Sequence, residues 1–103
     1  MSDLDLVVEA ITETIKPKKI ILFGSYARGD NREGSDLDLA VLQNGKPKIG
    51  QRAKVFRKLL KTGYSWKSEP DIHLFSEKVF NERLKNNSQF IREIMKGKTV
   101  YAA

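Results

Sequence analysis

Two short groups of polar residues follow one another in this chain and could together handle a phosphorylated ligand. Gly24 and Ser25 come directly after an apolar run, and after ten intervening residues Asp36 and Asp38 open a second apolar run. A glycine lets the backbone approach a phosphate because it has no Cβ, and a serine offers a hydroxyl and an N–H. Two nearby carboxylates can bind a hard cation. A nucleoside triphosphate that binds with magnesium needs both features.

The strand on which the acidic pair is predicted to lie sets the direction of its side chains. Residues 36–42 alternate between Asp36, Asp38 and Ala40 on one face and Leu37, Leu39 and Val41 on the other. Residues two apart on a strand share a face and have Cα atoms about 6.5 Å apart. The aspartates can therefore converge on one or two cations, and paired cations can stabilise both the attacking and the leaving oxygen in nucleotidyl transfer.

The five residues Ser-Asp-Leu-Asp-Leu occur twice, at 2–6 and at 35–39, so the acidic spacing by itself is a weak signal. In the first copy, Asp3 and Asp5 are expected to flank a helix start, where side chains two apart diverge and negative charge favours the helix dipole. Only the second copy follows a Gly-Ser pair and lies in a predicted strand. This context makes the second copy the candidate cation site.

Three further residues are candidates for the same site. Arg28 would lie one helical turn after Ser25 and could point back at a phosphate or at the acceptor. Asp71 opens a third predicted strand, where it could face the acidic pair, bind a second cation and accept the proton of an attacking hydroxyl. Alternatively, Asp71 is a surface residue that caps the strand start. His73 shares the face of Asp71, although a lone histidine in an apolar strand is more often a core or edge residue.

The apolar spacing predicts the order helix, strand, loop, strand, helix, strand and two helices. The first helix is expected over 2–15, with Ser2 and Asp5 as a capping box and Pro17 as its stop. The predicted strands cover 18–23, 36–42 and 71–75, and the later helices cover 49–62, 77–85 and 89–96. Residues 99–101 would form a short strand or an arm that could pair with another chain.

The helix at 49–62 is expected to turn Ala53, Phe56, Leu59 and Leu60 inward and to end at a Gly63 cap. Its outer face carries the densest group of basic residues, which is either solvated or available to an acidic partner. Beyond it, Tyr64 and Trp66 either pack against the sheet or form an exposed aromatic patch, and packing is the simpler interpretation. Tyr26 is expected to anchor its loop.

The composition bounds the class of protein. A chain of 103 residues has room for one domain, expected to span residues 1–103, and for no separate substrate domain. The absence of cysteine excludes disulfides and thiolate zinc sites. No apolar run approaches the roughly 20 residues that cross a bilayer, and the acidic N-terminus lacks the positive start of a secretory signal. We therefore expect a cytoplasmic protein with no membrane partner.

The net charge of +6 and the pI near 9.7 favour polyanions, among them nucleotide phosphates, RNA, DNA and acidic proteins. A lysine-rich solubilising surface is the simpler interpretation. The basic residues are spread over several segments, so the charge alone does not indicate a nucleic-acid-binding protein. Direct nucleic-acid binding would show as tight, salt-sensitive binding without a triphosphate, and it is the least favoured function.

These residues resemble the minimal nucleotidyltransferase (MNT) family, whose hallmark is Gly-Ser, ten residues and Asp-x-Asp. The spacing from Gly24-Ser25 to Asp36-Leu37-Asp38 matches without insertion, and Tyr26-Ala27-Arg28-Gly29 looks like the usual continuation. The resemblance extends over essentially the whole chain, including the third acidic strand and the closing segment 94–101. It implies the DNA polymerase β-like nucleotidyltransferase fold, an α+β (mixed α/β) class with a small mixed β-sheet flanked by helices. It also implies two magnesium ions and a nucleoside triphosphate, usually ATP.

Small single-domain members of this family commonly pair with a helical HEPN-type ribonuclease toxin in prokaryotic toxin–antitoxin modules. The similarity suggests an antitoxin that transfers AMP from ATP to a tyrosine hydroxyl of the toxin and silences it. By position, the resemblance implies that the metal ligands and catalytic carboxylates are Asp36, Asp38 and Asp71. The nucleotide-binding residues would be Gly24, Ser25 and Arg28.

Two other functions stay open at this point. The chain could be an antitoxin that acts by binding and occlusion with a vestigial nucleotide site; loss of an aspartate would favour this view, and none is lost. The chain could instead transfer a nucleotide to a small molecule such as an aminoglycoside. That activity would need a second domain to build the pocket, unless a partner or a second copy supplies it.

Overall fold

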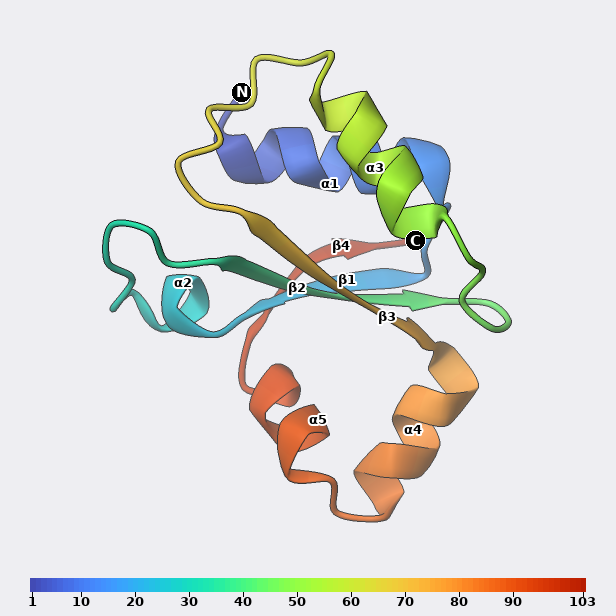
Figure 1. Cartoon of the computed structure of the whole chain (residues 1–103). Coiled ribbons are helices and arrows are strands. Elements are labelled where there is room, and N and C mark those ends of the chain that lie inside the picture. The colour runs from blue at the N-terminus through green and yellow to red at the C-terminus, as the bar shows by residue number, and fades with distance from the viewer.

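A computed structural model describes the whole chain, residues 1–103, and its centre is a four-stranded sheet (Figure 1). The strands are β1 (Lys19–Phe23), β2 (Leu37–Gln43), β3 (Pro70–Ser76) and β4 (Lys98–Ala102), and they lie in the order β3-β2-β1-β4. Strand β2 is parallel to β3, whereas β1 is antiparallel to both β2 and β4. The sheet is therefore mixed, as predicted.

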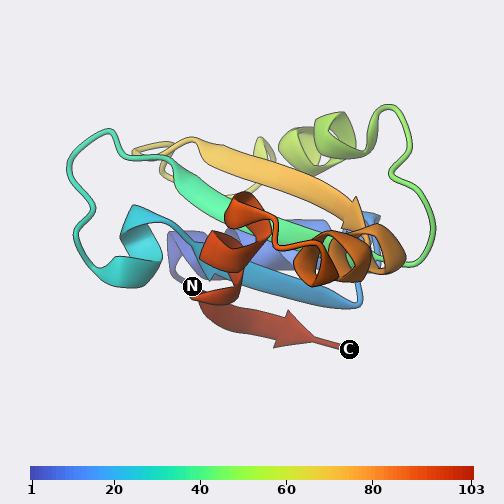
Figure 2. The same ribbon diagram turned by 90° about the horizontal axis from the view of Figure 1, so that it is seen from below.

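Helices cover both faces of this sheet. Helices α1 (Asp3–Thr14) and α3 (Gln51–Leu59) lie on one face, and α4 (Glu77–Lys85) and α5 (Gln89–Met95) lie on the other. The view from below shows α4 and α5 across the sheet, with β3 and β4 at its two opposite edges (Figure 2). The one-turn helix α2 (Ser25–Arg28) follows β1. None of these helices has both the length and the apolar character that crossing a bilayer requires.

Strand β2 is buried on both faces, because its alternating side chains enter two separate hydrophobic clusters. Leu37, Leu39 and Val41 pack with residues of α1 and α3. Ala40 and Leu42 pack on the opposite side with residues of α4 and α5, such as Phe80 and Ile94. The predicted polar face of this strand is therefore polar only at its beginning, and it becomes core from Ala40 onward. Helices α4 and α5 cover this face of the sheet and cause the difference.

The N-terminal copy of the acidic pair has a structural role, as predicted. The hydroxyl of Ser2 accepts a hydrogen bond from the Asp5 backbone N–H at 3.1 Å, and the Ser2 N–H donates to the Asp5 carboxylate at 3.2 Å. Asp3 accepts hydrogen bonds from the backbone and the hydroxyl of Ser65. This copy therefore caps α1 and ties the loop before β3 to the N-terminus.

Helix α3 is shorter than predicted, and two of its four predicted inward residues, Phe56 and Leu59, pack against the core. It ends at Leu59, with Leu60 as its cap, and does not continue to Gly63. Val55 and Leu59 are completely buried, whereas Ala53 is exposed and Leu60 is 70% exposed. Residues four apart share a helix face. The inward face therefore includes Val55, which was not predicted, together with Leu59, which was.

The loop before β3 is held by aromatic side chains. Tyr64 is buried, and its hydroxyl donates to the carbonyl of Ser68; burial and the nearby Asp3 charge raise the pKa of Tyr64 to about 12. The hydroxyls of Tyr26 and Ser68 also form a hydrogen bond. Trp66 stacks on a ring of α3 and stays 40% exposed. Tyr26 thus anchors α2 to the loop that leads into β3, as expected.

The closing residues form β4, which joins the sheet of its own chain. Its register with β1 runs from Lys19 opposite Ala102 to Leu22 opposite Lys98, with an irregularity in between. The turn from α5 into this strand passes close to β1, because a Cβ at Gly97 would overlap the Leu22 carbonyl oxygen. Of the two predicted forms, a short strand or an arm, the segment takes the first and is the edge strand that completes the sheet.

Candidate active site

The two halves of the Gly-Ser and acidic signal meet where β1 ends. The antiparallel ladder places Phe23 opposite Asp38, so the next residue of β1, Gly24, runs past the Asp38 side chain. A Cβ at Gly24 would collide with the Asp38 carboxylate, whose Cγ would be 3.2 Å away. Gly24 has φ 76° and ψ −156°, a region that essentially only glycine adopts. Glycine is thus required here for two independent reasons.

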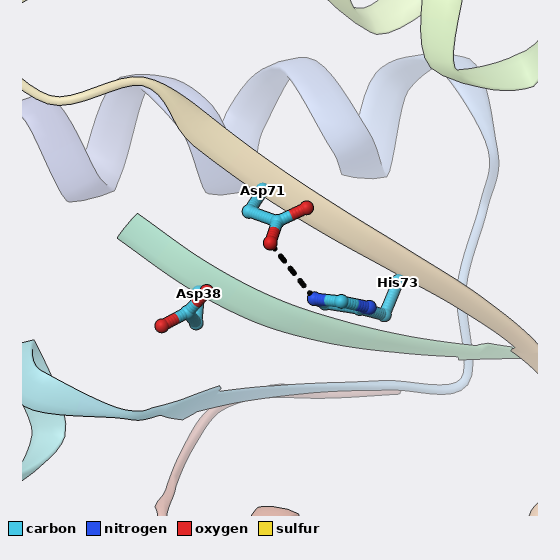
Figure 3. Close-up of side chains that lie close together, drawn as sticks. All are labelled: Asp38, Asp71 and His73. Atoms are coloured by element: carbon cyan, nitrogen blue, oxygen red, sulfur yellow. Dashed lines mark ion pairs between the residues drawn. The ribbon is translucent and has the colours of Figure 1, made fainter. Parts of the chain in front are cut away.

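The parallel pairing of β2 and β3 brings the second carboxylate into the site. It places Asp38 directly opposite Asp71, and Ala40 opposite His73. One oxygen from each aspartate and one nitrogen of His73 all lie within 4.8 Å of one another (Figure 3). The Nε2 atom of His73 is 3.1 Å from Oδ2 of Asp71. We call Asp38, Asp71 and His73 the Asp-Asp-His cluster.

Two aromatic rings hold the imidazole of His73 beside the carboxylates. The centroid of its ring is 5.4 Å from that of Phe23 on β1 and 5.4 Å from that of Phe90 on α5. The two phenylalanine rings are 5.8 Å apart, edge to face. From the sequence, His73 is expected on the face of Asp71, with a core or edge role as the favoured interpretation; in the structure it belongs to the cluster. Its spacing of two residues from Asp71 was the signal for membership of the site.

Asp36 lies outside this cluster. Strand β2 begins at Leu37, whose N–H donates to the Glu69 carbonyl at 3.0 Å, so Asp36 is an exposed loop residue and not the first strand residue as predicted. Its charge nevertheless reaches the site, because it is one of the charges that raise the pKa of Asp38. The structure therefore brings Asp38 and Asp71 together and leaves Asp36 at the rim of the site.

Arg28 and Ser25 lie in α2, next to Gly24. Arg28 is exposed and forms an ion pair with Asp30 at 3.1 Å. Arg28 and Gly24 both line a depression of about 90 Å³, together with Lys96 of the α5–β4 turn. Gly24 therefore borders two features, the Asp38 carboxylate and a depression of mixed charge. Glu93 also lines this depression, where it pairs with Lys96 at 2.9 Å.

Partial burial and nearby negative charge together set the electrostatics of the cluster. Partial burial raises the pKa of Asp38 most, and the charges of Asp71 and Asp36 raise it further, whereas His73 lowers it. A cation placed between these groups would relieve this repulsion. Two carboxylates provide the oxygen ligands that magnesium prefers. The donor set therefore fits a divalent cation.

Burial of Asp38 beside other carboxylates predicts that Asp38→Asn stabilises the fold. The folded-state pKa of Asp38 lies above its ordinary 3.8, so the folded state holds a proton that the unfolded state has already lost. Stability therefore falls as the pH rises from 3.8 through the folded-state pKa, and it stays lower at neutral pH. Asparagine cannot ionise, so the variant avoids this loss of stability. The variant should melt at a higher temperature than the wild type at neutral pH.

Calorimetric melting at two pH values checks this expectation. Below pH 3.8 the carboxyl is protonated in both states, so the advantage of Asp38→Asn should shrink there. Magnesium should stabilise the wild type and not the variant, because a ligand of the folded state raises its stability. An advantage that is the same at both pH values would show that packing, and not charge, causes it.

Comparison with known proteins adds to this geometry. A sequence model described as "Nucleotidyltransferase domain" matches residues 4–101. The curated protein "Putative protein adenylyltransferase MJ0141" of Methanocaldococcus jannaschii is 36% identical over 86 residues, which cover 82% of this chain and 80% of that protein. A second protein of that organism with the same kind of name, MJ1215, is 52% identical over 31 residues, or 30% of this chain and 36% of that protein.

Solved structures share the fold. One chain of a toxin–antitoxin crystal structure with AMP-PNP superposes with a TM-score of 0.67 at 24% identity, covering 96% of this chain and 73% of that chain. A chain of the toxin–antitoxin MntA–HpeT, in a mutant with two aspartates changed to glutamate, gives a TM-score of 0.65 at 21% identity. That match covers 100% of this chain and 75% of the other. At these identities the likeness establishes the arrangement of helices and strands.

Proposed function

The chain belongs to the nucleotidyltransferase domain family, with the fold of DNA polymerase β-like nucleotidyltransferases, and on this premise we propose that it transfers AMP from ATP to a hydroxyl of a partner protein. One observation carries the proposal: Gly24 packs against the same carboxylate, Asp38, that faces Asp71 across the sheet. A phosphate-facing turn and a cation-binding pair are thus parts of one site. We propose that residues 1–103 act as a single domain in this reaction.

Each residue of the site has a proposed role. The backbone of Gly24, which has no Cβ in the way, and the hydroxyl of Ser25 would bind the triphosphate, and Arg28 would hold a phosphate or the acceptor from the depression beside Gly24. Asp38 and Asp71, with Asp36 at the rim, would hold the magnesium, as one or two ions. Bound magnesium neutralises phosphate charge and stabilises the attacking and leaving oxygens.

The chain's own groups would move the proton. The hydroxyl oxygen of the acceptor forms a bond to the α-phosphorus, the bond from that phosphorus to the β-phosphate oxygen breaks, and pyrophosphate leaves. Asp71 is placed to accept the hydroxyl proton, because it is about half exposed and faces Asp38 across one strand pair. The Nε2 atom of His73 lies 3.1 Å from this carboxylate.

The proposed partner is a HEPN-type toxin and the proposed acceptor is a tyrosine, so that adenylylation would neutralise the toxin. Support comes from a relative whose name is that of a protein adenylyltransferase and from the fold shared with chains of toxin–antitoxin complexes. The exposure of the site also supports a protein acceptor, because the Asp71 side chain is 49% exposed and can be reached by a group of a partner.

Intact-mass spectrometry tests this function. The partner encoded by the neighbouring reading frame is incubated with this protein, magnesium and each nucleoside triphosphate in turn. We expect the partner mass to rise by one or more AMP units with ATP, and peptide mapping to place them on a tyrosine. A stable complex whose partner never gains mass would instead show that the partner is neutralised by occlusion. The acceptor of any nucleotide transfer would then be sought among small molecules and RNA.

A further inference from the structure

One of the three donors in the Asp-Asp-His cluster is a nitrogen, and this sets the cluster apart from a purely carboxylate site. Magnesium is a hard cation that takes oxygen ligands almost exclusively. For a site with both nitrogen and oxygen donors, affinity rises along the first transition series from manganese onward. The identity of the third donor therefore bears on which cation this chain holds best.

The distances suit a single cation that contacts all three side chains. Around an octahedral ion with bonds of about 2.1 Å, neighbouring ligand atoms are about 3.0 Å apart and opposite ones about 4.2 Å apart. Nε2 of His73 is 3.1 Å from Oδ2 of Asp71, which equals the neighbouring separation. The three donor atoms all lie within 4.8 Å of one another, so a small side-chain rotation would bring the more distant pairs to these separations.

The imidazole is also held in place before any cation binds. Phe23 contacts one part of the ring from β1, and Phe90 contacts it from α5. Phe23 is 7% exposed and part of the core, whereas Phe90 is 45% exposed and lies against the rings of Phe23 and His73. With both rings in place, Nε2 points toward Asp38 and Asp71 (Figure 3). Such a fixed donor loses little conformational freedom when it binds a metal.

We propose that His73 is a nitrogen ligand that makes this chain bind manganese, and transition-metal cations like it, in preference to magnesium, with Phe90 as the positioning residue. The inference rests on the proposed function in using the same two aspartates as cation ligands. A neutral Nε2 without hydrogen can bind a cation, whereas an Nε2 that carries hydrogen can only donate to Asp71. These two uses of one atom exclude each other, which makes the proposal testable.

Electron paramagnetic resonance of Mn²⁺ bound to the full chain provides the direct test. Pulsed measurement should reveal magnetic coupling of the bound Mn²⁺ to a ¹⁴N nucleus of His73. Titration should give a dissociation constant for Mn²⁺ at least about tenfold lower than that for Mg²⁺, measured by competition. Bound Mn²⁺ without nitrogen coupling would overturn the proposal, and so would equal affinity for the two ions.

Three variants, one at His73 and two at Phe90, separate ligation from structural support. His73→Asn should lose the nitrogen coupling and weaken Mn²⁺ binding at least about tenfold, while Mg²⁺ binding changes by less than about threefold. Phe90→Ala should weaken and broaden the coupling with no change in melting temperature, and Phe90→Tyr should restore it. Equal loss of both ions in His73→Asn would mean that the histidine only supports Asp71.

These measurements use no nucleotide and no partner, so they are independent of the transfer assay. A chain that adenylylates its partner but shows no nitrogen coupling would refute this inference and leave the proposed function intact. A chain that binds Mn²⁺ through nitrogen but modifies no partner would refute the proposed acceptor and leave the metal assignment intact.

Discussion

Changing Asp36 and Asp38 together to asparagine should abolish AMP transfer, with a loss on the order of 10³-fold or more. The change keeps the shape of both side chains and removes their charges, so cation binding is lost while packing is kept. Asp38 should account for most of the effect, because only Asp38 of the two lies in the Asp-Asp-His cluster. Intact mass of the partner over time gives the rate, and circular dichroism confirms the fold.

The chain supplies its own matched control for this experiment. Asp3 and Asp5 occur in an identical five-residue sequence but cap α1 and bind the loop before β3. Changing these two residues to asparagine should leave the transfer rate within about twofold of the wild type and cost about 1 kcal/mol or less of stability. If the double change at 36 and 38 were equally harmless to transfer, the metal mechanism would be wrong.

Gly24→Ala should lower transfer at least about 100-fold and should destabilise the fold by roughly 2 to 3 kcal/mol. The backbone at Gly24 lies in a region that alanine scarcely adopts, and the new Cβ would displace the Asp38 carboxylate. The strain lowers the stability, whereas the displacement lowers the rate. Chemical denaturation measures the first, and partner mass measures the second.

Gly29→Ala separates these two effects. Gly29 also has a positive φ, 81°, but it lies in the ordinary left-handed region, and a Cβ there would meet nothing within 4 Å. Its replacement should cost about 1 kcal/mol of stability and leave the transfer rate nearly unchanged. Equal losses of transfer in the two variants would show that backbone strain in α2, and not contact with Asp38, controls activity.

Local sequence signals were sufficient for much of the fold. The helix at 77–85 begins and ends where its Ser76 cap and the following asparagines place it, and the capping box at Ser2 forms as expected. Three strands were located from apolar runs bounded by glycine, proline and turn residues. Such signals act within a few residues of chain, so they can be interpreted without knowing the neighbours in space. The packing face of α3 depends on such neighbours, and its prediction failed at Ala53 and Leu60.

The sequence by itself determined the chemical identity of the site: the Gly-Ser turn, the acidic pair after ten residues, and a further aspartate at the start of a later strand. Only the tertiary structure decided which of these groups meet. The register of β2 against β3 places Asp38 opposite Asp71, and α5 brings Phe90 against His73. That register puts Asp36 at the rim and completes the cluster with a histidine. Pairings between strands far apart in the chain depend on the burial of whole faces, which no short stretch of sequence records.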